Sequence, residues 1–217
     1  MKVAFPRPRD YVSDLREEPK VFGFILWLFL FSLHWGAEVT CYGLFLSHRL
    51  GLSMTGMGWY MGFEFLALAL TCLWAGPRCD RGADPKTMAI AGLIISGTGQ
   101  MLMCIPVLWL SVLCRAFHGV GDGLIFMVMY TGIARLFIPS RVGGHNSALS
   151  LVMMTGMFAG SLVFSPLGER FGYEIPLIIT GALVGVLAFP IFYAGKGKRA
   201  TGPAPVVDPV PPTTQRP

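Results

Sequence analysis

Six long apolar stretches constrain this chain more than any other feature, and short loops with proline, glycine and charged residues separate them. Each stretch is long enough to cross about 30 Å of hydrocarbon as a helix. The predicted spans are residues 22–44, 56–74, 88–105, 107–137, 147–165 and 175–193. Charged residues make up only 13% of the chain, about half their share in a soluble domain. The sequence therefore predicts an all-α membrane protein with six transmembrane helices.

The basic residues lie almost entirely on one side of the predicted membrane. If both termini are cytoplasmic, nearly all lysines and arginines lie inside, and only Arg49 and Arg170 lie outside. This asymmetry follows the positive-inside rule. It predicts an even number of spans with both ends in the cytoplasm, and we expect the bacterial inner membrane as the location. Acidic residues before the long first apolar stretch argue against a cleaved signal peptide.

The chain divides into three predicted parts. Residues 1–20 mix both signs of charge and form a cytoplasmic lead-in, and residues 21–195 contain the six spans. Residues 196–217 begin with Lys196, Lys198 and Arg199 and then become rich in proline. Such a composition buries too little apolar surface to fold, so we expect a disordered cytoplasmic tail.

The fourth predicted span contains charged residues inside an otherwise apolar helix. Arg115, His118 and Asp122 are spaced so that they lie on one helical stripe, with Gly119 and Gly123 beside them. Charged residues inside the membrane normally face the interior of a bundle or a water-filled pathway. The stripe therefore indicates either a polar pathway or a structural ion pair that holds a bundle together.

Ionisable residues also lie in the first and second spans. His34 and Glu38 are one helical turn apart, and Glu64 lies in the second span. A rise of about 1.5 Å per residue places Glu38, Glu64 and Arg115 in one outer layer of the membrane. We therefore predict that Arg115 faces the first two spans and pairs with Glu38, Glu64 or both. The same count places Asp122 elsewhere, nearer the middle of the membrane.

These groups are the candidate transport or proton-coupling residues. They are His34, Glu38, Glu64, Arg115, His118 and Asp122. Three acids and one arginine cannot all be ionised cheaply in a poorly solvated site. We expect at least one acid to stay ionised beside Arg115 while another, with Asp122 the leading candidate, carries a proton. Further polar side chains that suit many small solutes are Thr40, Ser96, Thr98, Gln100, Tyr130 and Thr155.

The loop between the second and third spans has a distinctive spacing. Gly76 is followed by Asp80 and Arg81, and Lys86 comes after them. This loop resembles the signature loop of the major facilitator superfamily, in which a glycine, an aspartate, an arginine and then further glycine and basic residues join the second helix to the third. The second glycine is displaced, because Gly82 stands one place before the expected position.

A cytoplasmic latch is predicted around this loop. Asp80 can accept a charge-assisted hydrogen bond from a basic side chain, with Arg135 or Arg141 at the end of the fourth span as the leading partners. The latch residues are Gly76, Asp80, Arg81, Arg135 and Arg141. An ordinary loop that follows the positive-inside rule is the alternative interpretation.

The fourth and fifth spans extend the resemblance to the same superfamily. Arg115 followed by a run of glycines, and then Arg135 and Arg141, is an order common in the fourth helix of such transporters. The fifth span resembles the glycine-rich fifth helix of the family's antiporters, although Ser165 and Glu169 replace two glycines. Small residues four apart suit close helix contacts. The predicted helix-packing residues are Gly119, Gly123, Gly156, Gly160 and Pro166.

An internal repeat supports the resemblance. The pair His34 and Glu38 is echoed by His118 and Asp122, and Asp80-Arg81 after the second span is echoed by Glu169-Arg170 after the fifth. Three spans in each unit would make the two units inverted in the membrane. Two inverted three-helix units together form one six-helix half of a major facilitator transporter.

The resemblance implies a transporter half that pairs with itself or with another half to move a small solute, with a proton as one coupling candidate. A non-transporting membrane subunit of a larger complex is the alternative. The residues indicate no enzyme, no cofactor, no nucleic-acid partner and no metal site, because the cysteines lack ligand spacing. His34 and His118 suit a polar network better than haem, and the serines of the fifth span lack the setting of a serine protease.

Overall fold

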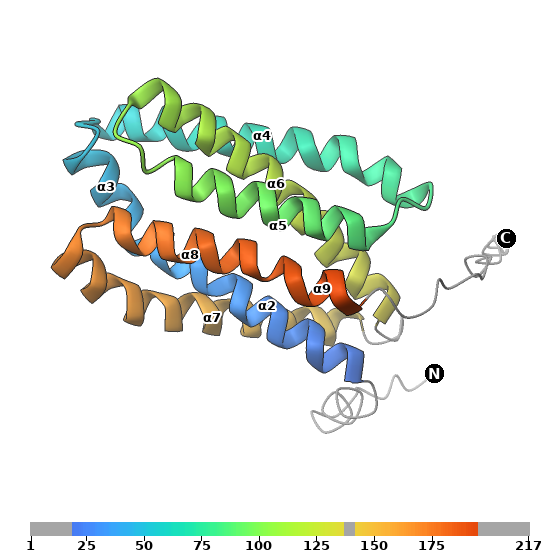
Figure 1. The fold of residues 1–217 in the computed structure, drawn as a ribbon. Helices are drawn as coiled ribbons and strands as arrows, with labels where there is room; N and C mark the ends of the chain where they lie inside the picture. Colours follow the sequence, from blue (N-terminus) through green and yellow to red (C-terminus); the bar gives the residue numbers. More distant parts are fainter. Residues whose placement is uncertain (1–18, 137–141, 195–217) are drawn as a thin grey trace, which may run out of the picture.

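The computed structural model describes residues 19–136 and 142–194, with side chains described for residues 22–132 and 143–191 (Figure 1). Within these ranges all regular structure is helical. In chain order the elements are α2 (Pro19–Ala37), the short π-helix η1 (Glu38–Tyr42), α3 (Gly43–His48), α4 (Met54–Asp80), α5 (Pro85–Leu102), α6 (Leu108–Leu136), α7 (Val142–Phe171), α8 (Glu174–Val186) and α9 (Ala188–Ala194). The predicted tail and residues 1–18 of the predicted lead-in lie outside the described residues, and Pro19 and Lys20 begin α2.

Five helical stretches of the described chain are long and apolar enough to cross a membrane. They are Phe22–His48, Met54–Asp80, Leu108–Gly132, Gly143–Phe171 and Glu174–Ile191. The stretch predicted as the third span is the helix α5, which is not among them. The helix α5 contains several polar residues, and two of them, Ser96 and Gln100, are fully buried. A helix enclosed by its neighbours needs fewer apolar residues than one that faces lipid, so the count of six spans stays a prediction.

The long helices run side by side along one common direction (Figure 1). The helices α4, α5 and α6 form one group, in which α6 packs against both α4 and α5. The helices α2, α7 and α8 form the other group, in which α2 packs chiefly against α7. Contact between α5 and α8 joins the two groups. The helix α6 thus packs against both other helices of its group, and α5 also contacts the second group.

Glycines allow α6 to approach its neighbours closely. A Cβ atom on Gly119 would lie 2.5 Å from the carbonyl oxygen of Glu64, and one on Gly123 would lie 2.7 Å from the Cβ of Thr71. Both contacts are with α4. On another side of α6, a Cβ atom on Gly121 would collide with the backbone of α5. The absence of side chains on these glycines therefore sets how close α6 lies to both neighbours.

The contact between α2 and α7 is built in the same way. A Cβ atom on Gly156 would lie 2.7 Å from the carbonyl oxygen of Phe29, and one on Gly160 would collide with the carbonyl oxygen of Leu33. Both glycines lie in α7, which continues through Pro166 to Phe171 as a single helix. The described structure thus places four of the predicted packing glycines, 119, 123, 156 and 160, at close helix contacts.

The loop between α4 and α5 is closed by local interactions. Gly82 has a φ of 87°, a conformation that favours glycine because a side chain would clash with the backbone. The glycine that stands one place early in the sequence pattern is therefore the one that the turn requires. Asp84 caps α5 by accepting hydrogen bonds from the backbone N–H groups of Lys86 and Thr87, both at 3.2 Å.

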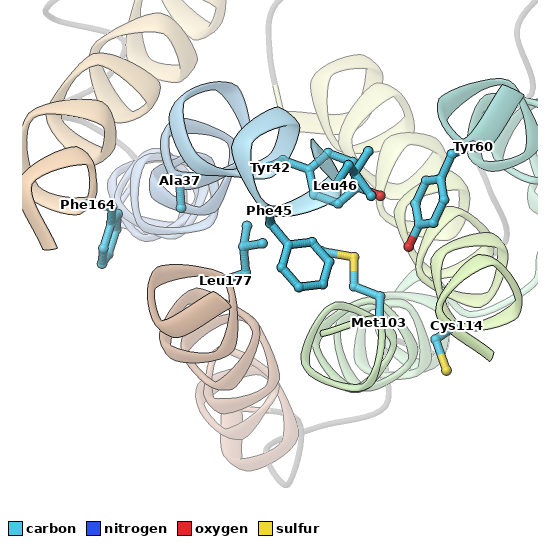
Figure 2. Packing of buried hydrophobic residues seen from close by; sticks show 9 residues of the cluster. All are labelled: Ala37, Tyr42, Phe45, Leu46, Tyr60, Met103, Cys114, Phe164 and Leu177. Atoms are coloured by element: carbon cyan, nitrogen blue, oxygen red, sulfur yellow. The ribbon is translucent and has the colours of Figure 1, made fainter. Parts of the chain in front are cut away.

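A buried apolar cluster lies where η1 and α3 meet the other helices. Figure 2 shows Phe45 and Leu177 pointing toward each other between α3 and α8, with Met103, the residue that caps the end of α5, beside them. Tyr42 and Tyr60 lie next to each other at the edge of this cluster, with ring centroids 5.8 Å apart. The cluster anchors η1 in the bundle, and η1 carries the acidic residue closest to the charged stripe of α6.

Candidate functional site

The charged stripe of α6 lies in the interior of the bundle. Arg115, His118 and Asp122 are at most 3% exposed. The helices α2 with η1, α4 and α5 surround the stripe, and each contributes at least one polar side chain to it. Burial of so many ionisable groups is expensive unless they are paired and hydrogen-bonded, so the contacts between them decide what the site can do.

Arg115 pairs with both Glu38 and Glu64, the two carboxylates predicted to lie at the same depth in the membrane. Its Nε and Nη2 atoms lie 2.7 Å and 2.6 Å from the same oxygen, Oε2 of Glu64. Its Nη1 atom donates to Oε1 of Glu38. The guanidinium carbon lies 4.2 Å from the centre of the Tyr42 ring, a cation–π contact. One arginine thus holds η1 and α4 against α6.

Tyr42 is a site residue that the sequence reasoning missed. Glu38 begins and Tyr42 ends the π-helix η1, and both side chains contact Arg115. A π-helix is wider than an α-helix and often occurs at functional sites. An ordinary helical pattern gives no sign of it, so no feature of the sequence marked Tyr42.

His118 joins this ion pair to Asp122. Its Nε2 atom lies 3.4 Å from Oε1 of Glu38, 3.6 Å from Oδ2 of Asp122 and 3.9 Å from Oε1 of Glu64. We expected Asp122 to lie apart from the Arg115 pair, yet the structure connects the two through one imidazole. Asp122 does lie about two helical turns from Arg115 along α6. The ring of His118 fills the space between them and contacts both Glu38 and Asp122.

Ser96 of α5 fixes the far side of the site. Its hydroxyl donates to Oδ1 of Asp122 at 2.6 Å, and its backbone carbonyl lies 2.9 Å from Nδ1 of His118. His34 of α2 completes the cluster, with its Nε2 atom 3.9 Å from Oδ2 of Asp122. All six predicted transport or proton-coupling residues therefore meet in one connected cluster, which we call the polar cluster: His34, Glu38, Glu64, Arg115, His118 and Asp122.

A cavity of about 440 Å³ reaches this cluster. Glu38, Glu64, Arg115 and Asp122 line part of its wall, and most of the rest is apolar. The apolar part includes aromatic side chains and four methionines, Met61, Met153, Met154 and Met157. Apolar pockets with a few converging polar groups are the usual form of small-molecule sites. The cavity therefore offers space for an organic solute in contact with buried charge.

The predicted cytoplasmic latch is only partly described. Asp80 is the last residue of α4 and is exposed, and Arg81 follows it as an exposed capping residue. Arg141 and the side chain of Arg135 lie outside the described residues, so the predicted pairing with Asp80 stays a prediction. Gly76 lies in α4, where a Cβ atom would make ordinary contact with Met127 of α6 at 3.7 Å.

A different acid organises the part of the loop that the structure describes. The Thr87 hydroxyl donates to Asp84 at 2.7 Å. This hydrogen bond, with those from the backbone N–H groups of Lys86 and Thr87, holds the pKa of Asp84 below its ordinary value, although slight burial acts in the opposite direction. The sequence signal for this cap was present, since Asp-Pro before an apolar run is a typical start of a helix.

Comparison with known proteins agrees with the geometry. A sequence model of the Major Facilitator Superfamily matches residues 21–215. Two relatives named multidrug resistance protein B homolog, from Mycobacterium tuberculosis strains CDC 1551 / Oshkosh and ATCC 25618 / H37Rv, are each 24% identical over 148 residues. The aligned region covers 64% of this chain and 27% of each relative, so the chain matches about a quarter of their length.

Proposed function

Because this chain belongs to the major facilitator superfamily, a family of integral membrane transporters, we propose that its helices form one transporter half. This half pairs with a second one, either a copy of itself or another chain, to enclose a pathway for a small solute. The observation that supports this most is the cavity, which brings an apolar wall and buried ionisable groups to one place. In this proposal the protein is a transporter and has no enzymatic activity.

The polar cluster is the proposed proton-coupling element. Asp122, His118 and Glu38 form a chain with separations of 3.6 Å and 3.4 Å between the imidazole Nε2 atom and the two carboxylate oxygens. His118 is therefore placed to pass a proton between the two acids. Arg115 holds Glu38 and Glu64 in position and balances part of their charge. Proton loading of Asp122 would change the charge that lines the cavity, and this would couple proton movement to solute binding.

The proposed solute is an amphipathic organic cation. Three acids against one arginine leave two negative charges in the cluster when both histidines are neutral. The methionines of the cavity wall adapt to different shapes because their side chains are flexible and polarisable. The names of the two mycobacterial relatives point to solutes of varied structure. An adaptable apolar wall beside excess negative charge fits such compounds.

We propose the following topology in the membrane. The helix α5 crosses as a sixth span, both termini lie in the cytoplasm, and the membrane is the bacterial inner membrane. Two inverted three-helix units make up the bundle. A reciprocal contact supports this arrangement, because His34 of the first unit approaches Asp122 of the second, and His118 of the second approaches Glu38 of the first.

Reconstitution into liposomes tests the proposal. An imposed pH gradient should drive accumulation of ethidium, a fluorescent amphipathic cation, in vesicles that contain the protein. An Asp122→Asn variant should lose this accumulation, while Glu174→Gln, which changes a carboxylate outside the polar cluster, should keep it. Native mass measurement in detergent should give a dimer or a complex with a second half. A monomer that moves no solute would favour the non-transporting subunit instead.

A further inference from the structure

We propose that the polar cluster holds one divalent transition-metal ion, with His118, Asp122, Glu64 and His34 as its ligands. No metal site was predicted from the sequence, because the proposed ligands come from the three separate helices α2, α4 and α6. The proposal goes beyond transport and does not depend on it. It rests on the direction, burial and spacing of donor atoms in the described structure.

Each histidine directs toward the cluster a ring nitrogen that makes no hydrogen bond to any described residue. Nδ1 of His118 lies 2.9 Å from the carbonyl oxygen of Ser96, and Nδ1 of His34 contacts the carbonyl oxygen of Phe31. A carbonyl oxygen only accepts hydrogen bonds, so each Nδ1 carries a proton and donates it. In the neutral rings each Nε2 therefore has a free lone pair. Within the described part of the chain neither Nε2 has a hydrogen-bond partner, although both are buried.

This arrangement of the rings is typical of metal ligands. A histidine that binds a metal nearly always donates its other ring N–H to a carbonyl or carboxylate, which fixes the tautomer and the ring plane. Asp122 has comparable support, because Ser96 donates to its Oδ1 at 2.6 Å and leaves Oδ2 directed at both histidines. Ser96 thus orients two of the proposed ligands from α5.

The donor atoms are spaced for one ion. Nε2 of His118 lies 3.6 Å from Oδ2 of Asp122 and 3.9 Å from Oε1 of Glu64. Nε2 of His34 lies 3.9 Å from the same Asp122 oxygen. Two ligands of a tetrahedral zinc ion lie about 3.4 Å apart. The donor atoms of Glu64, His118 and Asp122 all lie within 4.8 Å of one another, so these three would bind the ion first. The imidazole of His34 would then move toward the ion from its position beside Asp122.

Arg115 decides which glutamate takes part. Oε1 of Glu38 is the oxygen that faces His118, but it already accepts from Arg115. Glu64 uses Oε2 for Arg115 and leaves Oε1 free toward His118. Glu64 is therefore the proposed ligand, and Glu38 is the neighbour that keeps the arginine in place.

Charge and access also fit a divalent ion. With both histidines neutral, the three acids and Arg115 leave two negative charges unbalanced, and one divalent cation balances them. The cavity is lined by Glu64 and Asp122, so an ion can reach two of its ligands. Two imidazoles with two carboxylates suit Zn²⁺, Co²⁺ or Mn²⁺ better than Mg²⁺, which prefers oxygen ligands and retains its water.

The test uses the full chain, purified in detergent without a histidine tag and stripped of metal with EDTA. Titration calorimetry with Zn²⁺ should show saturable binding of one ion per chain, and Mg²⁺ should give none. Co²⁺ should produce the visible absorption of a four-coordinate site without a thiolate charge-transfer band. Asp122→Asn and His118→Gln should each weaken Zn²⁺ binding at least about tenfold, and Glu174→Gln should leave it unchanged.

Two results would overturn the proposal: no saturable Zn²⁺ binding by the unchanged protein, or equal affinity in the Asp122→Asn variant. Asparagine keeps the shape of the aspartate side chain, so this variant decides the matter even if His118→Gln fails to fold. Thermal unfolding of each variant without metal shows which ones are folded. Because no solute, gradient or second half is involved, failure of metal binding and failure of the proposed transport are separate outcomes.

Discussion

The contact of α6 with α4 and the contact of α2 with α7 both bring helices close together at glycines, but the first, together with η1, also holds buried charge. Arg115 bridges Glu38 and Glu64 across the first contact, and every one of these groups needs its partners. Across the second contact, Gly156 and Gly160 let two backbones touch without any charge. Both contacts are therefore sensitive to an added side chain, and the first is also sensitive to removal of a charged group.

Loss of Arg115 should have the largest effect. An Arg115→Leu variant leaves two buried carboxylates without their counter-ion, and removing one partner of a buried ion pair typically costs about 3–5 kcal/mol. Thermal unfolding in detergent measures this loss. Adding Glu38→Gln and Glu64→Gln should restore part of it, because the added changes remove the unpaired charges. A triple variant no more stable than the single one would contradict this account of the contact.

Addition of a side chain to the glycine contact should come next. A Cβ atom on Gly160 would collide with the carbonyl oxygen of Leu33, so Gly160→Ala should destabilise the protein by about 1–3 kcal/mol, the usual cost of overpacking. Gly185→Ala in α8 is the matched control, since nothing lies within 4 Å of its Cβ position. Equal thermal stabilities of the two variants would show that close approach of α2 and α7 is unimportant.

An exposed acid should matter less than the buried ones. Asp84→Ala removes the cap of α5, at a cost of about 1 kcal/mol. Because the pKa of Asp84 lies below its ordinary value, its stabilisation is complete above the ordinary aspartate pKa of about 3.9 and is lost as the pH falls through the lower folded value. The difference in thermal stability between the variant and the unchanged protein should therefore narrow only below about pH 4. A difference that is independent of pH would contradict the cap.

The smallest effect should come from the ion pair outside the polar cluster. Arg49 donates to Glu174 at 2.6 Å, but its side chain is 57% exposed. Exposed pairs contribute about 0–1 kcal/mol and are screened by salt. Arg49→Gln should change thermal stability by less than about 1 kcal/mol, and raising the salt concentration should reduce that change. An effect as large as that of Arg115→Leu would remove the distinction between buried and exposed charge.

The sequence predicted the main contact of the site because depth in a membrane follows from counting residues. The rise per residue placed Arg115 level with Glu38 and Glu64, and the structure pairs all three. Counting could not show that His118 would reach both Glu38 and Asp122, because the reach of a side chain depends on how the helices rotate.

Other features depended on which helices are neighbours. The glycines at positions 36 and 97 make closer contacts than Gly156, yet the sequence analysis did not select them. The helix α5 was predicted at nearly the right place, but its packing between α6 and α8 could not be deduced from its composition. The sequence thus indicates which helices carry charge more reliably than which helices touch.

The central claim is that the polar cluster couples proton movement to solute movement, and the Asp122→Asn variant tests it most directly. Two rates are compared in liposomes: ethidium uptake driven by a pH gradient, and exchange of ethidium across the membrane without a gradient. We predict that the variant loses gradient-driven uptake and keeps exchange at a reduced rate, because the apolar wall, Glu38 and Glu64 remain in the cavity while the proton-carrying group is gone. Retention of gradient-driven uptake at the unchanged rate would contradict the claim, and so would equal loss of both rates in a folded variant.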